Sequence, residues 1–156
     1  EEQPVLLPLY LQECRVLRYS FIKDKNLTPD VLLQIEESDV LLIDTVGILS
    51  SLYKYGSFAY IGGGFGAGIH NILEAAVYGI PVIFGPRYHK FMEAKDLIRL
   101  GGAVPVKDAG SLEQTVKTFL TDPEKRHEAG RICREYVESG KGASEKVCKT
   151  IQRWLQ

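Results

Sequence analysis

The residues best suited to chemistry lie in one stretch of the chain, Tyr60–Glu74, which reads YIGGGFGAGIHNILE. Five glycines fall within seven of its positions: Gly62, Gly63, Gly64, Gly66 and Gly68. Glycine allows positive φ and lets the backbone approach a ligand closely. Free amides at the start of the following helix, together with the helix dipole, favour an anion. The stretch therefore predicts a phosphate site, with a flexible turn as the alternative; a P-loop is excluded, because no Gly-Lys-Ser/Thr follows.

Three polar residues at the end of this stretch strengthen the prediction: His70, Asn71 and Glu74. Asn71 and Glu74 are three positions apart, which makes them neighbours on one face of a helix. A carboxylate there could accept hydrogen bonds from both hydroxyls of a ribose while the loop amides hold the phosphate. In the alternative interpretation, Glu74 is merely solvated and Asn71 caps the helix. We interpret His70 as an orienting or phosphate-facing residue rather than as a general base.

The elements that must position these residues follow from the apolar pattern, in which short Val-, Ile- and Leu-rich runs alternate with helical stripes. Strands are expected at Arg15–Phe21, Asp39–Ile43 (a buried strand), Phe58–Ile61, Pro81–Phe84 and Ala103–Val106. Helices are expected at Pro4–Gln12, at Val46–Lys54, from Ile69 to a stop at Gly79, at Phe91–Leu100, at Ser111–Leu120, from Asp122-Pro123 to Gly140, and at Ala143–Leu155. This order predicts an α/β fold, a Rossmann-like parallel sheet with helices on both faces and the ligand outside the carboxyl ends of the strands.

Composition narrows the function classes. The chain has 156 residues, 45% of them apolar, and its net charge of −1 argues against a general nucleic-acid binder. Its longest apolar runs, such as Val40–Ile43, are far too short to cross a bilayer. Cys14, Cys133 and Cys148 form no CxxC motif or Cys/His cluster, so neither a disulfide framework nor a zinc site is expected.

A larger pattern of spaced motifs resembles a known family. Residues Ile43–Ala103 resemble the nucleotide-binding half of a GT-B glycosyltransferase and, more narrowly, the 3-deoxy-D-manno-octulosonic acid (Kdo) transferases of lipopolysaccharide biosynthesis, which use CMP-Kdo. The matching pieces are Asp44-Thr45-x-Gly47, Leu52-Tyr53, Ile61-Gly62-Gly63, His70-Asn71-x-Leu73-Glu74, Gly79-x-Pro81-Val82, and Gly85-Pro86 followed by Phe91. Two positions depart from the family pattern: Ile48 replaces a usual acidic residue, and Gly64 stands where the family often has serine.

The resemblance implies a donor site on these residues. Amides of Gly63–Gly68 and of a helix start at Ile69–Asn71 would hold the CMP phosphate, and Glu74 would bind the ribose. The loop Thr45–Gly47 would line the cytosine. Arg87 would meet the sugar or the phosphate, with a solvated loop arginine as the alternative. The implied donor-binding residues are Thr45, Gly47, Gly62, Gly63, Gly64, Gly66, Gly68, His70, Asn71, Glu74 and Arg87.

The resemblance also implies what this chain lacks. We expect one donor-binding domain over residues 1–156, with the catalytic base, the lipid A-type acceptor site and the membrane contact in an absent amino-terminal domain. No catalytic residue, metal or cofactor is expected here, and transfer would be a direct inverting displacement. The full-length enzyme would work at the cytoplasmic face of the bacterial inner membrane, and this domain would be soluble.

Other readings stay open at this point. The first is another GT-B-like enzyme, a UDP-sugar transferase or epimerase, which would differ in the loop that reads the base. The second is a non-catalytic interaction module that binds a nucleotide. A separate expectation concerns the last helix, whose stripe of Ala143, Val147, Ile151, Trp154 and Leu155 needs a partner surface, and there we expect Trp154 to be partly buried.

Overall fold

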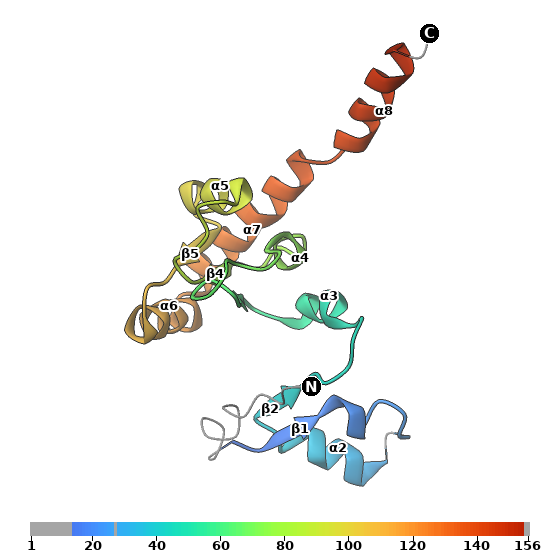
Figure 1. Ribbon diagram of the computed structural model, residues 1–156. Coiled ribbons are helices and arrows are strands. Elements are labelled where there is room, and N and C mark those ends of the chain that lie inside the picture. The colour runs from blue at the N-terminus through green and yellow to red at the C-terminus, as the bar shows by residue number, and fades with distance from the viewer. Residues whose placement is uncertain (1–13, 27, 155–156) are drawn as a thin grey trace. The chain divides into compact units, whose positions relative to one another are not determined.

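The structure is a computed structural model that describes residues 14–26 and 28–154, without the side chains of residues 143–146, 149 and 153. The predicted helix Pro4–Gln12 lies outside the described residues. The chain forms two compact units, one ending at Leu49 and the other beginning at Ser50, and each is described by itself (Figure 1). No helix among the described residues is long and apolar enough to span a bilayer.

The first unit is built on two parallel strands, β1 (Val16–Arg18) and β2 (Val40–Leu42), in a register that pairs Val16 with Val40. Both lie where strands were predicted, but residues 19–21 form a 3-10 turn, η1 (Tyr19–Phe21). The expectation of a buried second strand is wrong, since Leu41 is 47% exposed. A helix that the prediction missed, α2 (Pro29–Glu36), joins the strands. The Thr28 hydroxyl oxygen accepts from the Val31 amide, and proline at the first helical position is a start signal present in the sequence.

The second unit contains a parallel sheet in the order β3–β4–β5. Its strands are β3 (Ala59–Ile61), β4 (Val82–Phe84) and β5 (Ala103–Pro105), all three at predicted positions. The helical elements are α3 (Leu49–Leu52, which begins at the unit boundary), η2 (Tyr53–Tyr55), α4 (Leu73–Ala76), α5 (Met92–Leu100), α6 (Ala109–Thr121), α7 (Pro123–Ser139) and α8 (Ala143–Trp154). The α/β prediction with a parallel sheet is confirmed.

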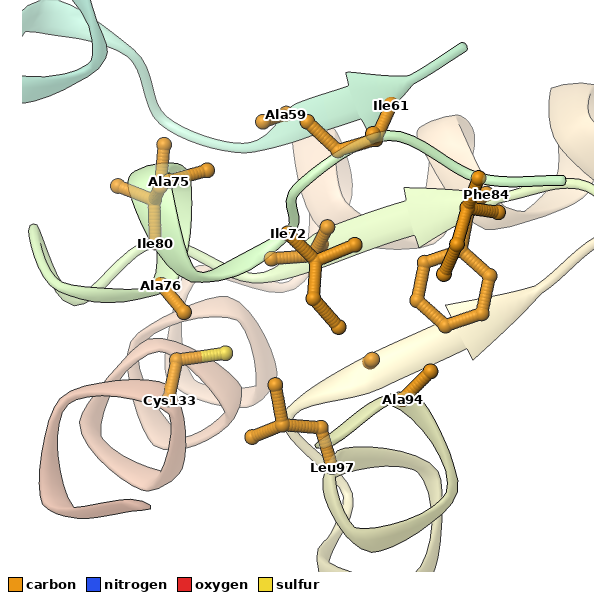
Figure 2. Packing of buried hydrophobic residues seen from close by; sticks show 13 residues of the cluster. Ala59, Ile61, Ile72, Ala75, Ala76, Ile80, Phe84, Ala94, Leu97 and Cys133 are labelled. Atoms are coloured by element: carbon orange, nitrogen blue, oxygen red, sulfur yellow. The ribbon is translucent and has the colours of Figure 1, made fainter. Parts of the chain in front are cut away.

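Helices cover both faces of this sheet because the side chains of the central strand alternate between them. Val82 and Phe84 of β4 enter one cluster of buried side chains, which α4, α5 and α7 complete with residues such as Leu97 and Cys133 (Figure 2). Ile83 enters a second cluster with Phe119 of α6. All three β4 residues are buried, which explains the continuous apolar run of this strand in the sequence.

Helix ends follow local capping chemistry. The helix expected from Ser111 begins at Ala109, because Asp108 is the N-cap and Ser111 takes the third helical position of a capping box. The helix expected from Asp122-Pro123 is confirmed: the Asp122 side chain accepts from the Lys125 amide at 2.9 Å, and α7 ends before Gly140. Boundaries therefore depend on which side chain caps the first turn.

The last helix was predicted at the correct place, but its tryptophan was not. Trp154 is 86% exposed, so the expectation of partial burial is wrong. Ile151 and Val147, one and two turns away on the same stripe, are 52% and 56% exposed. The apolar stripe of α8 therefore predicts correctly that this segment is a helix, but it does not predict whether the side chains of the stripe are buried.

Candidate functional site

Two loops meet at the carboxyl edge of the sheet in the second unit. β3 leads directly into the glycine loop, residues Gly62–Gly68, and β4 leads into the loop Gly85–Phe91. The two backbones touch: a Cβ built on Gly64 would lie 2.6 Å from the Gly85 nitrogen. The predicted ligand edge of the sheet is therefore formed by these two closely packed loops.

The glycine loop uses several of its own amides. The amides of Gly66 and Gly68 donate to the Gly63 carbonyl at 2.8 and 3.2 Å, and the His70 amide donates to the Gly62 carbonyl at 3.2 Å. The expectation that all amides from Gly63 onward face a phosphate is wrong for these three, because the turn itself needs them. Within the described residues, the amides of Gly64, Phe65 and Ala67 donate to no acceptor. Gly64 is buried, whereas Phe65 and Ala67 are exposed, so the amides of these two residues are available to an anion.

The glycines serve packing as well as any ligand. Gly63 has φ +86°, and a Cβ there would clash with the Gly68 carbonyl oxygen. Gly64 is buried and its backbone lies against Gly85. Gly66 has neither restriction, since its Cβ would only approach the Gly63 carbonyl oxygen at 3.6 Å. The close approach of the backbone thus explains why glycine is needed at positions 63 and 64 without any ligand. It does not explain why position 66 is glycine.

The helix after this loop begins later than predicted. α4 starts at Leu73 instead of Ile69, and the residues before it form an irregular segment anchored by Ile69 and Ile72, which are 4% and 1% exposed. The Asn71 side-chain oxygen accepts from the Leu73 amide at 3.0 Å. The predicted helix start at Ile69–Asn71 is therefore wrong: the first helical turn lies further along the chain, and the Asn71 side-chain oxygen already binds its Leu73 amide.

Asn71 and Glu74 are brought together, as predicted. The Asn71 side-chain amide donates to Glu74 Oε1 at 3.0 Å, and both residues are exposed. The Asn71 side chain thus binds both the Leu73 amide in the first turn of α4 and the Glu74 carboxylate, while the N-cap position itself is Ile72. This arrangement fixes one carboxylate oxygen of Glu74 and leaves Oε2 open to a hydroxyl donor.

Tyr53 is a site residue that sequence reasoning did not assign. It packs against the main buried cluster, and η2, which it begins, contacts α4. Burial raises the pKa of the Tyr53 phenol, and the negative charge of Glu74 raises it further. The motif Leu52-Tyr53 was noticed in the sequence, but only the fold places this ring near the carboxylate.

The remaining predicted residues of the second unit lie on the same loops. His70 is exposed, and its imidazole edge lies over the glycine loop, where a Cβ on Gly63 would approach Cδ2 at 3.3 Å. The Arg87 guanidinium Nη1 donates to the Gly66 carbonyl at 2.6 Å, and the Arg87 amide donates to the Gly64 carbonyl at 2.9 Å. Arg87 is thus bound to the glycine loop instead of being a freely solvated arginine.

The two other predicted residues, Thr45 and Gly47, follow β2 in the first unit. Gly47 has φ +96° with nothing near its Cβ position, so the conformation alone requires glycine there. Thr45 Oγ1 is buried and has no hydrogen-bond partner among the described residues. Next to this loop, the Asp44 carboxylate accepts from the hydroxyl and the amide of Ser20 at 2.7 and 2.9 Å. These hydrogen bonds, the hydroxyl one first, hold the pKa of Asp44 below its usual range.

A pocket of about 340 Å³ opens at the carboxyl ends of β4 and β5. Its lining residues are Pro86, Tyr88, His89, Pro105, Val106, Lys107 and Ser111. The loop after β4 therefore has two contacts: its Arg87 binds the glycine loop, and three of its other residues line this pocket. Among the described residues, no group of three His, Cys, Asp or Glu side chains is placed to hold a metal.

The sequence matches no family model. It is 47% identical over 68 residues to the 3-deoxy-D-manno-octulosonic acid transferase of Aquifex aeolicus, a match that covers 43% of this chain and 19% of that protein. With the enzyme of the same name from Bordetella pertussis it shares 32% identity over 119 residues, 75% of this chain and 28% of the relative. The chain therefore spans less than a third of the length of these curated relatives.

A solved structure has the same fold. It is described as the C-terminal CMP-Kdo binding domain of WaaA from Acinetobacter baumannii and superposes with a TM-score of 0.66. The superposition covers 81% of this chain and 64% of that domain, at 23% identity. The likeness shows that the two chains share a Rossmann-like α/β fold.

Proposed function

We propose that this chain, which is similar in sequence to the 3-deoxy-D-manno-octulosonic acid transferases, is the donor-binding domain of such an enzyme. Its ligand would be CMP-Kdo, the compound that the similar domain from Acinetobacter baumannii is described as binding. The amides of the exposed loop residues Phe65 and Ala67 would meet the phosphate, and the loop Thr45–Gly47 would meet the cytosine.

The observation that carries this proposal is the pairing of Glu74 with Asn71 beside the glycine loop. A ribose offers two hydroxyl donors, and an ionised carboxylate with one oxygen held in place is a suitable acceptor for them. The phosphate and the ribose of a nucleotide are adjacent. The glycine loop and the Glu74 carboxylate, which would bind them, are likewise close together in the chain. Backbone amides that stabilise charge developing on the departing nucleotide would be this domain's contribution to rate.

The rest of the reaction belongs to the whole enzyme. We propose that the catalytic base, the lipid A-type acceptor site and the contact with the cytoplasmic face of the inner membrane lie in a further domain. Transfer would proceed by direct inverting displacement without a metal or other cofactor. In the described part of this chain, we assign no residue as a general base.

The test is a titration of the 156-residue chain with CMP, followed through backbone amide resonances. We expect weak binding, because part of the cleft would lie in the proposed further domain, with the largest shifts at residues 62–71. UMP, which differs only in the base, should bind more weakly. Tighter binding of UMP than of CMP would favour a uridine nucleotide enzyme, and an equal response would contradict the reading of cytosine. Shifts confined to the opposite edge of the sheet would contradict the assignment.

The Glu74→Gln variant tests the ribose contact directly. Glutamine keeps the shape and an oxygen that can accept from Asn71, but it removes the charge. A charged hydrogen bond contributes about 1.5 kcal/mol or more, so the Kd for CMP should rise about tenfold. Glu113→Gln, at another exposed glutamate on α6, is the control and should bind CMP like the wild type. An unchanged Kd in Glu74→Gln would make Glu74 an ordinary surface carboxylate.

A further inference from the structure

Arg87 connects the two loops of the carboxyl edge through two separate hydrogen bonds. Its backbone amide binds the Gly64 carbonyl at 2.9 Å, and its guanidinium binds the Gly66 carbonyl at 2.6 Å. No described carboxylate forms an ion pair with it, so the cation's observed partner is the loop backbone. The Arg87 side chain therefore holds one point of the glycine loop from outside.

Such a contact matters because of the loop's composition. Glycine loses more conformational freedom than any other residue when it is ordered, and five of the seven loop residues are glycines. The amides of Gly66 and Gly68 inside the loop, and that of His70 just after it, donate to the Gly63 and Gly62 carbonyls. Beyond Gly64, the Arg87 guanidinium donates a hydrogen bond from the next loop to this segment, in addition to the ring contacts of Phe65 near Gly85 and of Phe91 near Gly68. A loop ordered in advance loses less entropy when a ligand binds.

We propose that Arg87 is a positioning residue of the donor site. Its guanidinium fixes the Gly66 carbonyl and thereby keeps the glycine loop in the form that leaves the amides of Phe65 and Ala67 to the donor phosphate. This inference rests on the proposed function and goes beyond it, because it assigns Arg87 to the protein backbone instead of to the ligand.

The test compares Arg87→Met with a matched variant, Arg134→Met. Arg134 also donates to a backbone carbonyl, that of Tyr78 at 2.9 Å, but beyond the other end of α4. In Arg87→Met the bond from the residue 87 amide to Gly64 is retained, and only the side-chain contact is lost. Hydrogen exchange of the Gly66, Gly68 and His70 amides, measured by NMR without nucleotide, reports the loop, and the Kd for CMP reports binding.

We expect Arg87→Met to exchange these three amides about fivefold faster and to bind CMP about fivefold more weakly, as the loss of one hydrogen bond of this kind predicts. Arg134→Met should leave both quantities unchanged. Arg87→Lys, which keeps the charge but not the planar fork, should fall between wild type and Arg87→Met in both measurements.

A change in only one of the two measured quantities, the amide exchange rate or the Kd for CMP, would overturn the inference. Weaker CMP binding with unchanged exchange would mean that Arg87 contacts the nucleotide itself. Faster exchange with unchanged CMP affinity would mean that the ordered loop does not serve the donor. A wild-type chain that binds no CMP would overturn the proposed function and the donor part of this inference, while the exchange rates would still decide whether Arg87 holds the loop.

Discussion

At the scale of single residues, the glycines of the loop after β3 differ in what they do. Gly63 requires its positive φ, and Gly64 lies against the backbone of Gly85. Gly66 has room for a side chain and an ordinary φ. The Gly-rich sequence therefore contains glycines that the packing requires, Gly63 and Gly64, and one that it does not require, Gly66. The same stretch suggested a phosphate site from composition alone, but composition did not separate these two roles.

Gly64→Ala tests this difference. Its Cβ would lie 2.6 Å from the Gly85 nitrogen, and one of the two loops must move. We expect the free energy of unfolding to fall by about 1–3 kcal/mol, the usual cost of overpacking, as measured by urea denaturation. Gly66→Ala is the matched control and should stay within about 0.5 kcal/mol of the wild type. Equal stability of the two variants would contradict the close approach of the loops.

At the scale of elements, side chains at strand ends connect neighbouring strands. In the first unit, Asp44 follows β2 and accepts two hydrogen bonds from Ser20, which follows β1. In the second unit, Arg87 connects the loops after β3 and β4 in a similar way. Each contact joins segments more than twenty residues apart, so the ordering of each loop depends on its neighbour in the sheet.

The Asp44 contact predicts a pH dependence of stability. Hydrogen bonds from Ser20 lower the pKa of Asp44 below its ordinary value of 3.8, so the folded chain binds fewer protons at this site than the unfolded chain. The stabilisation is therefore complete above the ordinary pKa and is lost as pH falls through the folded one. Thermal melting of wild type and Asp44→Asn between pH 7 and 3 should show a difference in Tm that shrinks toward low pH. In a Ser20→Ala background this pH-dependent difference should be smaller, and an undiminished one would contradict the contact.

At the scale of the whole molecule, the proposed donor residues are divided between two compact units. The loop Thr45–Gly47 belongs to the first, and the glycine loop, Asn71, Glu74 and Arg87 belong to the second. The second unit contains the three-stranded sheet and both buried clusters. Under the proposed function, recognition of the base would depend on the first unit, and binding of the phosphate and ribose would depend on the second.

A fragment of residues 50–156 tests that division. We expect it to fold, because it contains both buried clusters of the second unit, and circular dichroism with a cooperative melting transition would establish this. It should bind CMP more weakly than the full chain and should discriminate less between CMP and UMP, since the proposed base-reading loop is absent. Discrimination equal to that of the 156-residue chain would place base recognition in the second unit.

The sequence by itself determined the fold class, the positions of all three strands of the second unit, the last two helices and the family motifs. These depend on local signals: apolar runs, helical stripes, caps and glycines that act over a few neighbouring residues. Even the missed helix α2 had its start signal, Thr28-Pro29, in the sequence. Tertiary structure alone decided that α4 begins at Leu73, where buried isoleucines hold the preceding segment. It also decided that Tyr53 lies near Glu74, that Ser20 binds Asp44 and that Arg87 binds Gly66. Each of these contacts joins segments distant in the chain, and only the paired strands and packed helices bring such segments within hydrogen-bonding or electrostatic range.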